Sequence, residues 1–184
     1  MSFNLIRAVA GTENNDDIHL GRLLLLLSAA NKRSSRSIKG ITKLAKMDFL
    51  LRYPNCLERA LEAENKNSKL AEIKSYERTT IESKMVRFKY GPWDARYRRW
   101  LSLLASLGLV NIDIKGRTVI IELTEKGQNV AEQFSTDAAY SDINIRSQLI
   151  INTFGTMSAT RIKDFVYEVF PELETMKWGE DIQL

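Results

Sequence analysis

The chain has very few of the side chains on which metal and nucleophile chemistry depend. Among its 184 residues there are one cysteine, Cys56, and one histidine, His19. A single cysteine excludes an internal disulfide and a cysteine-based zinc site, and a single histidine argues against a histidine-based metal site or triad. We therefore expect no metal, no cofactor and no catalytic residue, and a protein that is not an enzyme.

Signals for a membrane, for export and for nucleotide phosphates are also missing. The opening MSFNLIRAVAGTENNDD has no basic start followed by a long apolar run, and the most apolar stretch, 23–30, is too short to cross a bilayer. KYGPWD has a single glycine and WGED is short and acidic, so neither is a phosphate loop. We expect a cytoplasmic protein without membrane contact, in a reducing setting.

Charge is abundant and unevenly spread along the chain, although the formal net charge is only +4. The basic residues of the front part are Lys32, Arg33, Arg36, Lys39, Lys43, Lys46 and Arg52. The acidic residues near the end are Asp164, Glu168, Glu172, Glu174, Glu180 and Asp181. This asymmetry is compatible with an anionic partner on one side and a basic partner on the other, or with ordinary solvated helix surfaces.

Leucines at helical spacing predict a first helix that begins near Asp16 or Asp17, whose carboxylates can cap its free amides. The polar stretch 31–37 is expected to be a loop. A second helix is expected over about 41–53, and Pro54 ends it because the residue before proline is pushed out of helical geometry. Three basic side chains of this helix are expected to stay in water: Lys43, Lys46 and Arg52.

The stretch 62–84 is polar, mixed in charge and poor in core residues, so it is either an exposed helical excursion or a mobile loop. Two further helices are expected at 142–153 and 158–170. Gly155 provides the break between them, and Pro171 ends the second.

The stretch KYGPWDARYRRW combines three arginines with four aromatic side chains. Asp94 can cap a helix that runs to about Leu107, where Gly108 stops it. The expected buried side of this helix comprises Tyr97, Trp100, Leu101, Leu104 and Leu107. Its cationic side chains are Arg96, Arg98 and Arg99.

The following stretch, LVNIDIKGRTVIIELTEKG, predicts a β-hairpin and then a helix. With a two-residue turn at Lys115 and Gly116, the expected pairs are Ile114 with Arg117, Ile112 with Val119, and Val110 with Ile121. This register puts the apolar side chains of both strands on one face. Thr124 can cap a helix over 125–134.

Helices, a recognition-type helix, a hairpin and a further helix follow one another in the order of a winged helix-turn-helix. We therefore expect a mostly α fold with a small β-hairpin (α+β), a winged helix-turn-helix with additional C-terminal helices. The expected parts are N-terminal helices (1–61), a polar insertion (62–84), the recognition-type helix, hairpin and following helix (85–137), and a C-terminal helical extension with an acidic tail (138–184).

Three interpretations of the arginines remain open: a solvated or locally paired face, a DNA-binding helix, and a protein interface. In the DNA interpretation the helix contacts bases or phosphates in a major groove, and the hairpin tip reaches a phosphate or the minor groove. The candidate DNA- or partner-binding residues are Arg96, Arg98, Arg99, Lys115, Arg117, Lys43 and Lys46. The interleaved Tyr97 and Trp100 are expected to belong to the core.

Four stretches together carry a resemblance to a known family. KLAKMDFLLRYP, MVRFKYGPWD, the hairpin with LTEKG, and FGTMSATRIKDFVYEVFPE before GEDI resemble the middle component of three-component ABC-ATPase (ABC-3C) defence systems, the group that includes Lamassu. The resemblance implies a non-catalytic winged-helix adaptor between an SMC-like or Rad50-like ATPase and a nuclease-type effector, acting against phage or plasmid DNA. Weak, non-specific DNA contact is part of that expectation.

The resemblance also implies a structural role for the turn formed by Gly91, Pro92, Trp93 and Asp94. Pro92 would fix the chain, Trp93 anchor it in the core, and Asp94 cap the next helix. The alternative is a stand-alone winged-helix DNA-binding transcriptional regulator. A hydrolase is poorly supported, because His19 is explained as a partly exposed polar residue and Cys56 as a small buried filler.

Overall fold

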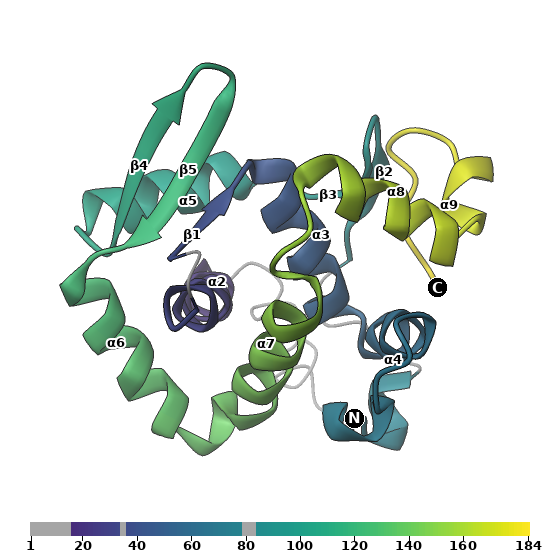
Figure 1. The fold of residues 1–184 in the computed structure, drawn as a ribbon, viewed down its shortest axis with the longest axis horizontal. Helices are drawn as coiled ribbons and strands as arrows, with labels where there is room; N and C mark the ends of the chain where they lie inside the picture. Colours follow the sequence, from purple (N-terminus) through teal and green to yellow (C-terminus); the bar gives the residue numbers. More distant parts are fainter. Residues whose placement is uncertain (1–15, 34–35, 79–83) are drawn as a thin grey trace, which may run out of the picture.

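The computed structural model describes residues 16–33, 36–78 and 84–184 (Figure 1). Its α-helices are α2 (Asp16–Asn31), α3 (Ile41–Arg52), α4 (Pro54–Ala63), α5 (Tyr97–Ser106), α6 (Glu125–Thr136), α7 (Ser141–Phe154), α8 (Ala159–Val169) and α9 (Glu172–Thr175). Short 3-10 helices are η1 (Ser68–Ala71), η2 (Ser75–Arg78) and η3 (Ala138–Tyr140). Parts of three predicted segments, 1–15, 34–35 and 79–83, lie outside the described residues.

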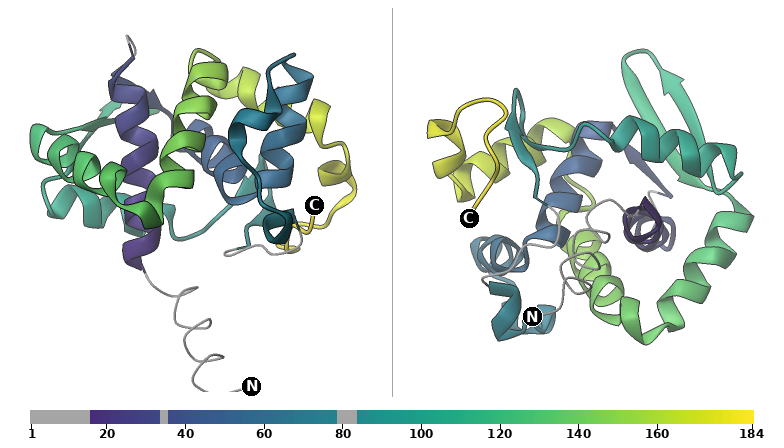
Figure 2. Two further views of the ribbon diagram at one scale, coloured as in Figure 1. Left: turned by 90° about the horizontal axis from the view of Figure 1, so that it is seen from below. Right: turned by 180° about the vertical axis from the view of Figure 1, so that it is seen from behind.

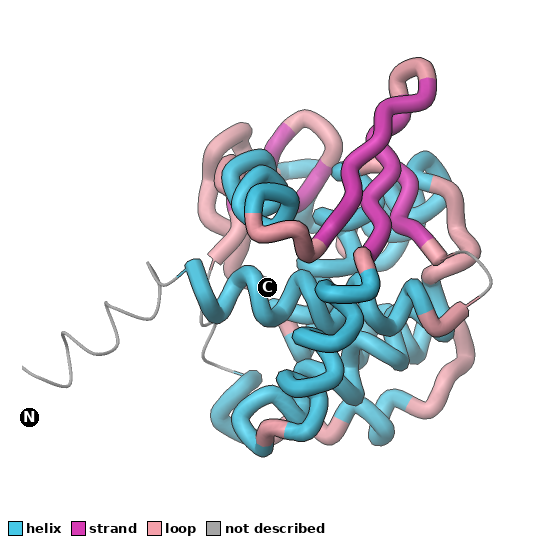
Figure 3. Tube along the Cα trace, turned by 90° about the vertical axis from the view of Figure 1, so that its left-hand side faces the viewer, coloured by secondary structure: helices cyan, strands magenta, loops and turns pink. Residues whose placement is uncertain are grey.

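The strands form two small antiparallel sheets, so the expected mostly α, α+β class is confirmed. They are β1 (Ser37–Lys39), β2 (Val86–Phe88), β3 (Gly91–Trp93), β4 (Val110–Lys115) and β5 (Thr118–Leu123). The larger sheet has the order β1-β5-β4 and the smaller one pairs β2 with β3. Figure 3 shows the β4–β5 hairpin extending beyond the helices.

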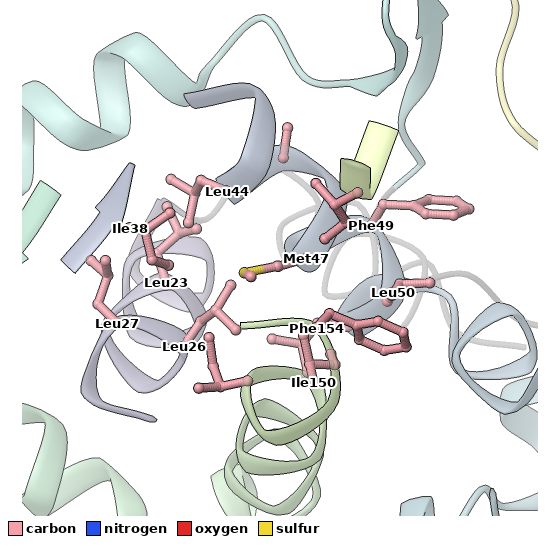
Figure 4. Packing of buried hydrophobic residues seen from close by; sticks show 14 of the residues in the cluster. Leu23, Leu26, Leu27, Ile38, Leu44, Met47, Phe49, Leu50, Ile150 and Phe154 are labelled. Atoms are coloured by element: carbon pink, nitrogen blue, oxygen red, sulfur yellow. The ribbon is translucent and has the colours of Figure 1, made fainter. Parts of the chain in front are cut away.

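Helix α2 lies at the centre of the fold because it is apolar on all sides. Leu23 to Leu27 are each no more than 2% exposed. The helix packs against α7, α6 and β5, and Figures 1 and 2 show α6 and α7 curving around it. In Figure 4, Leu26, Met47 and Ile150 point toward one another from α2, α3 and α7. None of the described helices has the length and apolar character needed to cross a bilayer.

The predicted hairpin register is wrong by two residues. Ile114 pairs with Val119 and Ile112 with Ile121, so the turn residues are Gly116 and Arg117. Gly116 has φ +63°, and glycine supplies that conformation at the first central position of a two-residue turn. Because the register is shifted by an even number of residues, the predicted set of apolar side chains still shares one face.

Several boundaries follow the sequence signals. Thr124 caps α6 by accepting a hydrogen bond from Gly127 N, and Ser158 caps α8 by accepting one from Arg161 N.

Strand β1 was not predicted, since three residues are too few for a periodic signal. Leu107, expected in the core, is 50% exposed, because α5 ends at Ser106 and the chain turns there.

Lys43, Lys46 and Arg52 were expected in water, and the structure buries all three. Lys43 Nζ donates to the Gly155 carbonyl oxygen at 2.7 Å, at the end of α7. Lys46 Nζ donates to the Pro92 carbonyl oxygen at 2.8 Å. The expectation failed because other elements cover every side of α3, which periodicity within one helix cannot reveal.

The polar insertion and the acidic tail are both attached to the helices where the structure describes them. Arg146 of α7, 3% exposed, donates to the Ala71 carbonyl oxygen and pairs with Glu77 at 2.7 Å. Glu172 pairs with Arg59 of α4 at 2.6 Å. Ile182, in the tail, is fully buried.

Candidate docking surface on α5 and the β4–β5 hairpin

Asp94 organises the chain just before α5. Its carboxylate accepts a hydrogen bond from Arg96 N at 2.9 Å, and it pairs with Arg96 and with Arg52 of α3 at 2.8 Å. Burial alone would raise the pKa of this carboxyl group, but Arg96 and Arg52 lower it to about 2. Asp94 therefore fixes the approach to the helix, which itself begins at Tyr97, later than predicted.

A buried charge cluster attaches the first residue of α5 to α2 and α3. Asp48 of α3 is fully buried and pairs with Arg22 at 2.6 Å and Arg52 at 2.9 Å. It also accepts a hydrogen bond from the Tyr97 hydroxyl at 2.6 Å. Burial would raise the pKa of Asp48, yet the two arginines hold it well below its usual range. This cluster joins α2, α3 and α5.

The aromatic side chains of α5 are core residues, as expected. Trp100 and Tyr97 are fully buried. The guanidinium of Arg96 lies 4.8 Å from the Trp100 ring centroid, and the His19 ring stacks on Trp100 at 4.4 Å. His19 is 1% exposed, which corrects the expectation of a partly exposed residue. These rings cannot serve as an external stacking platform.

The three arginines of the predicted site have different surroundings. Arg96 is about one-third exposed and bound to Asp94. Arg99 is exposed and pairs with Asp16 of α2 at 2.5 Å. Arg98 is exposed, and within the described ranges it has neither an ion pair nor a hydrogen bond from its side chain. Locally paired and free cations thus occur on one helix.

The hairpin tip adds two exposed cations. Lys115 lies 4.0 Å from Asp113, and Arg117 has no side-chain partner among the described residues. We call a set of eight exposed residues of α5 and of this hairpin the α5–hairpin surface. Its members are Arg98, Arg99, Ser102, Ser106, Ile112, Ile114, Lys115 and Arg117. Lys43 and Lys46 do not belong to it, because burial removes them from contact with a partner.

The sequence did not predict the apolar part of this surface. Ile112 is 39% exposed and Ile114 67% exposed, although apolar residues that alternate along a strand usually face a core. The inner end of their face is covered, and Ile121 is fully buried. The outer end of the hairpin extends beyond the helices. The alternating pattern therefore predicted correctly which side chains share a face, but it did not predict that the outer ones are exposed.

The described residues contain no group of three or more histidine, cysteine, aspartate or glutamate side chains that could hold a metal ion. No protein-family model matches the chain, and no curated protein or solved structure is significantly similar to it.

Proposed function

We propose that this protein is a winged-helix docking module that acts as a non-catalytic adaptor. The order α2, β1, α3, α5, β4, β5 with the strand order β1-β5-β4 supports a winged helix. In that fold α5 takes the place of the recognition helix and the β4–β5 hairpin is the wing. Helix α4 and the β2–β3 hairpin are then an insertion between the second and third helices.

The mixed character of the α5–hairpin surface favours a protein partner over DNA. Of the three arginines predicted at α5, Arg96 is engaged by Asp94 and Arg99 by Asp16, which reduces the positive charge available to phosphates. The exposed Ile112 and Ile114 add an apolar patch of the kind found at protein interfaces. The exposure of these two isoleucines is the observation that carries the proposal.

The resemblance in the sequence suggests which partners to test. An adaptor of this kind would bind an SMC-like or Rad50-like ATPase and a separate nuclease-type effector in a defence complex against phage or plasmid DNA. Its own role would be to bridge the two proteins and to supply surfaces rather than chemistry.

Co-expression with an SMC-like or Rad50-like ATPase encoded beside this chain, followed by affinity purification, tests the proposal. A stoichiometric complex is expected for the unchanged protein and its loss for Ile112→Asp with Ile114→Asp. Leu70→Asp is the matched control, since Leu70 is 54% exposed on η1. Recovery of the unchanged chain without the ATPase would contradict the adaptor assignment.

A stand-alone DNA-binding regulator is the second candidate, because Arg98 and Arg117 are exposed and free of described partners. We expect weak binding to duplex DNA with little sequence preference. Arg98→Ala with Arg117→Ala should reduce the slope of log affinity against log salt by about two, since each lost phosphate contact removes about 0.9. Fluorescence anisotropy at several salt concentrations measures this slope, and an unchanged slope would exclude these residues as phosphate contacts.

A further inference from the structure

A second exposed surface lies on the small sheet, on the other side of α3 from the β4–β5 hairpin (Figure 1). It carries three large aromatic side chains. Phe88 is 47% exposed, Tyr90 50% and Trp178 63%. The rings of Phe88 and Trp178 contact each other, with centroids 6.0 Å apart. We call these three residues the aromatic platform.

Backbone hydrogen bonds hold the platform in place. The segment after α9 runs beside β2 and is bound to it through the backbone. Gly179 N donates to the Arg87 carbonyl oxygen at 2.7 Å, Arg87 N donates to that of Glu180 at 2.8 Å, and Asp181 forms an isolated β-bridge with Val86. Gly91, which follows Tyr90, has φ +93° and closes the β2–β3 turn. Phe88 therefore projects from β2, and Trp178 projects from a turn that is hydrogen-bonded to β2 rather than from a free end.

Lysines alternate with the rings along the chain, and their ammonium groups form no ion pair with the described residues. Lys89 stands between Phe88 and Tyr90, with its Nζ 5.3 Å from the Tyr90 ring centroid. Lys177 precedes Trp178 directly. Neither lysine has an ion pair within the ranges that the structure describes.

Several other lysines of the chain are engaged internally, in contrast to these two. Lys74 and Lys163 pair with carboxylates, whereas Lys43 and Lys46 donate to backbone carbonyl oxygens. The one carboxylate bound within the Lys177 turn belongs to Glu180, and it accepts a hydrogen bond from the Lys177 backbone N. The ammonium groups beside the platform are left for an external anion.

We propose that the aromatic platform binds single-stranded nucleic acid. Unpaired bases stack on exposed rings while neighbouring cations meet the phosphates, and this combination is sequence-tolerant. A duplex keeps its base faces closed and cannot use the rings in this way. Protein interfaces are enriched in aromatic residues but depleted in lysine. The alternation of lysine and aromatic residues therefore favours single-stranded nucleic acid over a protein as the partner. This inference does not depend on the proposed adaptor role.

Fluorescence anisotropy with a fluorescein-labelled oligothymidine of about twenty nucleotides, long enough for one such site, tests the proposal on the full chain. We expect Trp178→Ala to weaken binding about five- to a hundredfold, the effect of losing one stacked base. Lys89→Gln with Lys177→Gln should reduce the salt slope by about 1.4, since each single-strand phosphate contributes about 0.7.

Leu70→Ala and Tyr76→Ala are matched controls, since both residues are exposed and lie on other elements. Both variants should bind the oligonucleotide as the unchanged chain does, and unlabelled duplex should compete poorly. Equal binding by Trp178→Ala, or equal competition by duplex, would overturn the proposal. Capture of the co-expressed ATPase that is lost in Trp178→Ala, with no oligonucleotide binding, would instead make the platform a protein contact and overturn it as well.

Discussion

At the scale of single residues, Lys46 has an unusual environment. Its side chain is 1% exposed and its Nζ donates to the Pro92 carbonyl oxygen. Burial, with a smaller contribution from Arg87, lowers the pKa of Lys46 from 10.5 to about 7. The β2–β3 hairpin therefore rests on a lysine that titrates near neutrality.

Replacing Lys46 by methionine should flatten the pH dependence of stability. Because the folded-state pKa is lowered, the unfolded chain binds more protons than the folded one above about pH 7. The free energy of unfolding should therefore rise with pH between about 7 and 9, by up to about 1.4 kcal/mol per unit. Urea denaturation across this window measures the slope, and equal slopes for Lys46→Met and the unchanged chain would contradict the prediction.

Asp48 is the centre of the buried charge cluster, so its removal should be costly. Asp48→Ala leaves Arg22 and Arg52 buried without their shared carboxylate, and we expect a loss of about 3–5 kcal/mol in the free energy of unfolding. Asp142→Ala is the control, because its ion pair with Lys74 is partly exposed and should contribute about 0–1 kcal/mol. Similar losses in both variants, measured by chemical denaturation, would count against a special role for the cluster.

At the scale of elements, the junction between the β4–β5 hairpin and α6 depends on close backbone approach. A Cβ atom on Gly127 would lie 1.9 Å from the Leu109 carbonyl oxygen. Thr124 accepts a hydrogen bond from Gly127 N and its own N donates to that same Leu109 oxygen. No side chain fits between α6 and the strand at this point, which explains the glycine in LTEKG.

Gly127→Ala should therefore destabilise the protein by about 3 kcal/mol or more, since the clash is with backbone and cannot be relieved by a rotamer change. Gly116→Ala is the matched control. It imposes a left-handed φ on alanine, but there is open space around it, so we expect a cost of about 1–2 kcal/mol. Thermal unfolding of the two variants distinguishes the effects, and a smaller loss for Gly127→Ala than for Gly116→Ala would refute the packing argument.

At the scale of the whole molecule, the C-terminal segment closes the fold. The Tyr53 hydroxyl donates to the Ile182 carbonyl oxygen at 3.1 Å and accepts a hydrogen bond from Met85 N at 2.8 Å. Ile182 N donates to the Met85 carbonyl oxygen at 2.8 Å. Residues 85 and 182 thus meet at Tyr53, the residue that joins α3 to α4.

Deletion of residues 177–184 should lower stability by about 2–5 kcal/mol, comparable to loss of a buried isoleucine side chain. It should also reduce the protection of two amides. Arg87 N would lose its acceptor, the Glu180 carbonyl oxygen, and Met85 N donates to the Tyr53 hydroxyl, which would lose its own acceptor on Ile182. Hydrogen exchange followed by mass spectrometry measures their protection. Unchanged protection in the truncated chain would mean that the segment is attached without supporting the sheet.

The candidate surfaces were only partly predictable from the sequence. The exposed Arg98 and Arg117 follow from helical spacing and from the turn. The burial of Lys46 and the exposure of Ile114 do not, because each depends on whether another element covers the residue. Strand β1 and the backbone pairing of the C-terminal segment with β2 were also missed, since each gains its hydrogen bonds from partners distant in the sequence.

The sequence by itself determined most of the longer helices and the presence of the β4–β5 hairpin, because spacing, caps and breakers act within a few residues of one another. Thr124 and Ser158 cap their helices wherever those helices are placed. Only the tertiary structure decided which charges are internal: Asp48 and Asp94 draw Arg22, Arg52 and Arg96 into ion pairs that join α2, α3 and the segment before α5. Electrostatic pairing and burial depend on distances between segments far apart in the chain, and local patterns do not contain those distances.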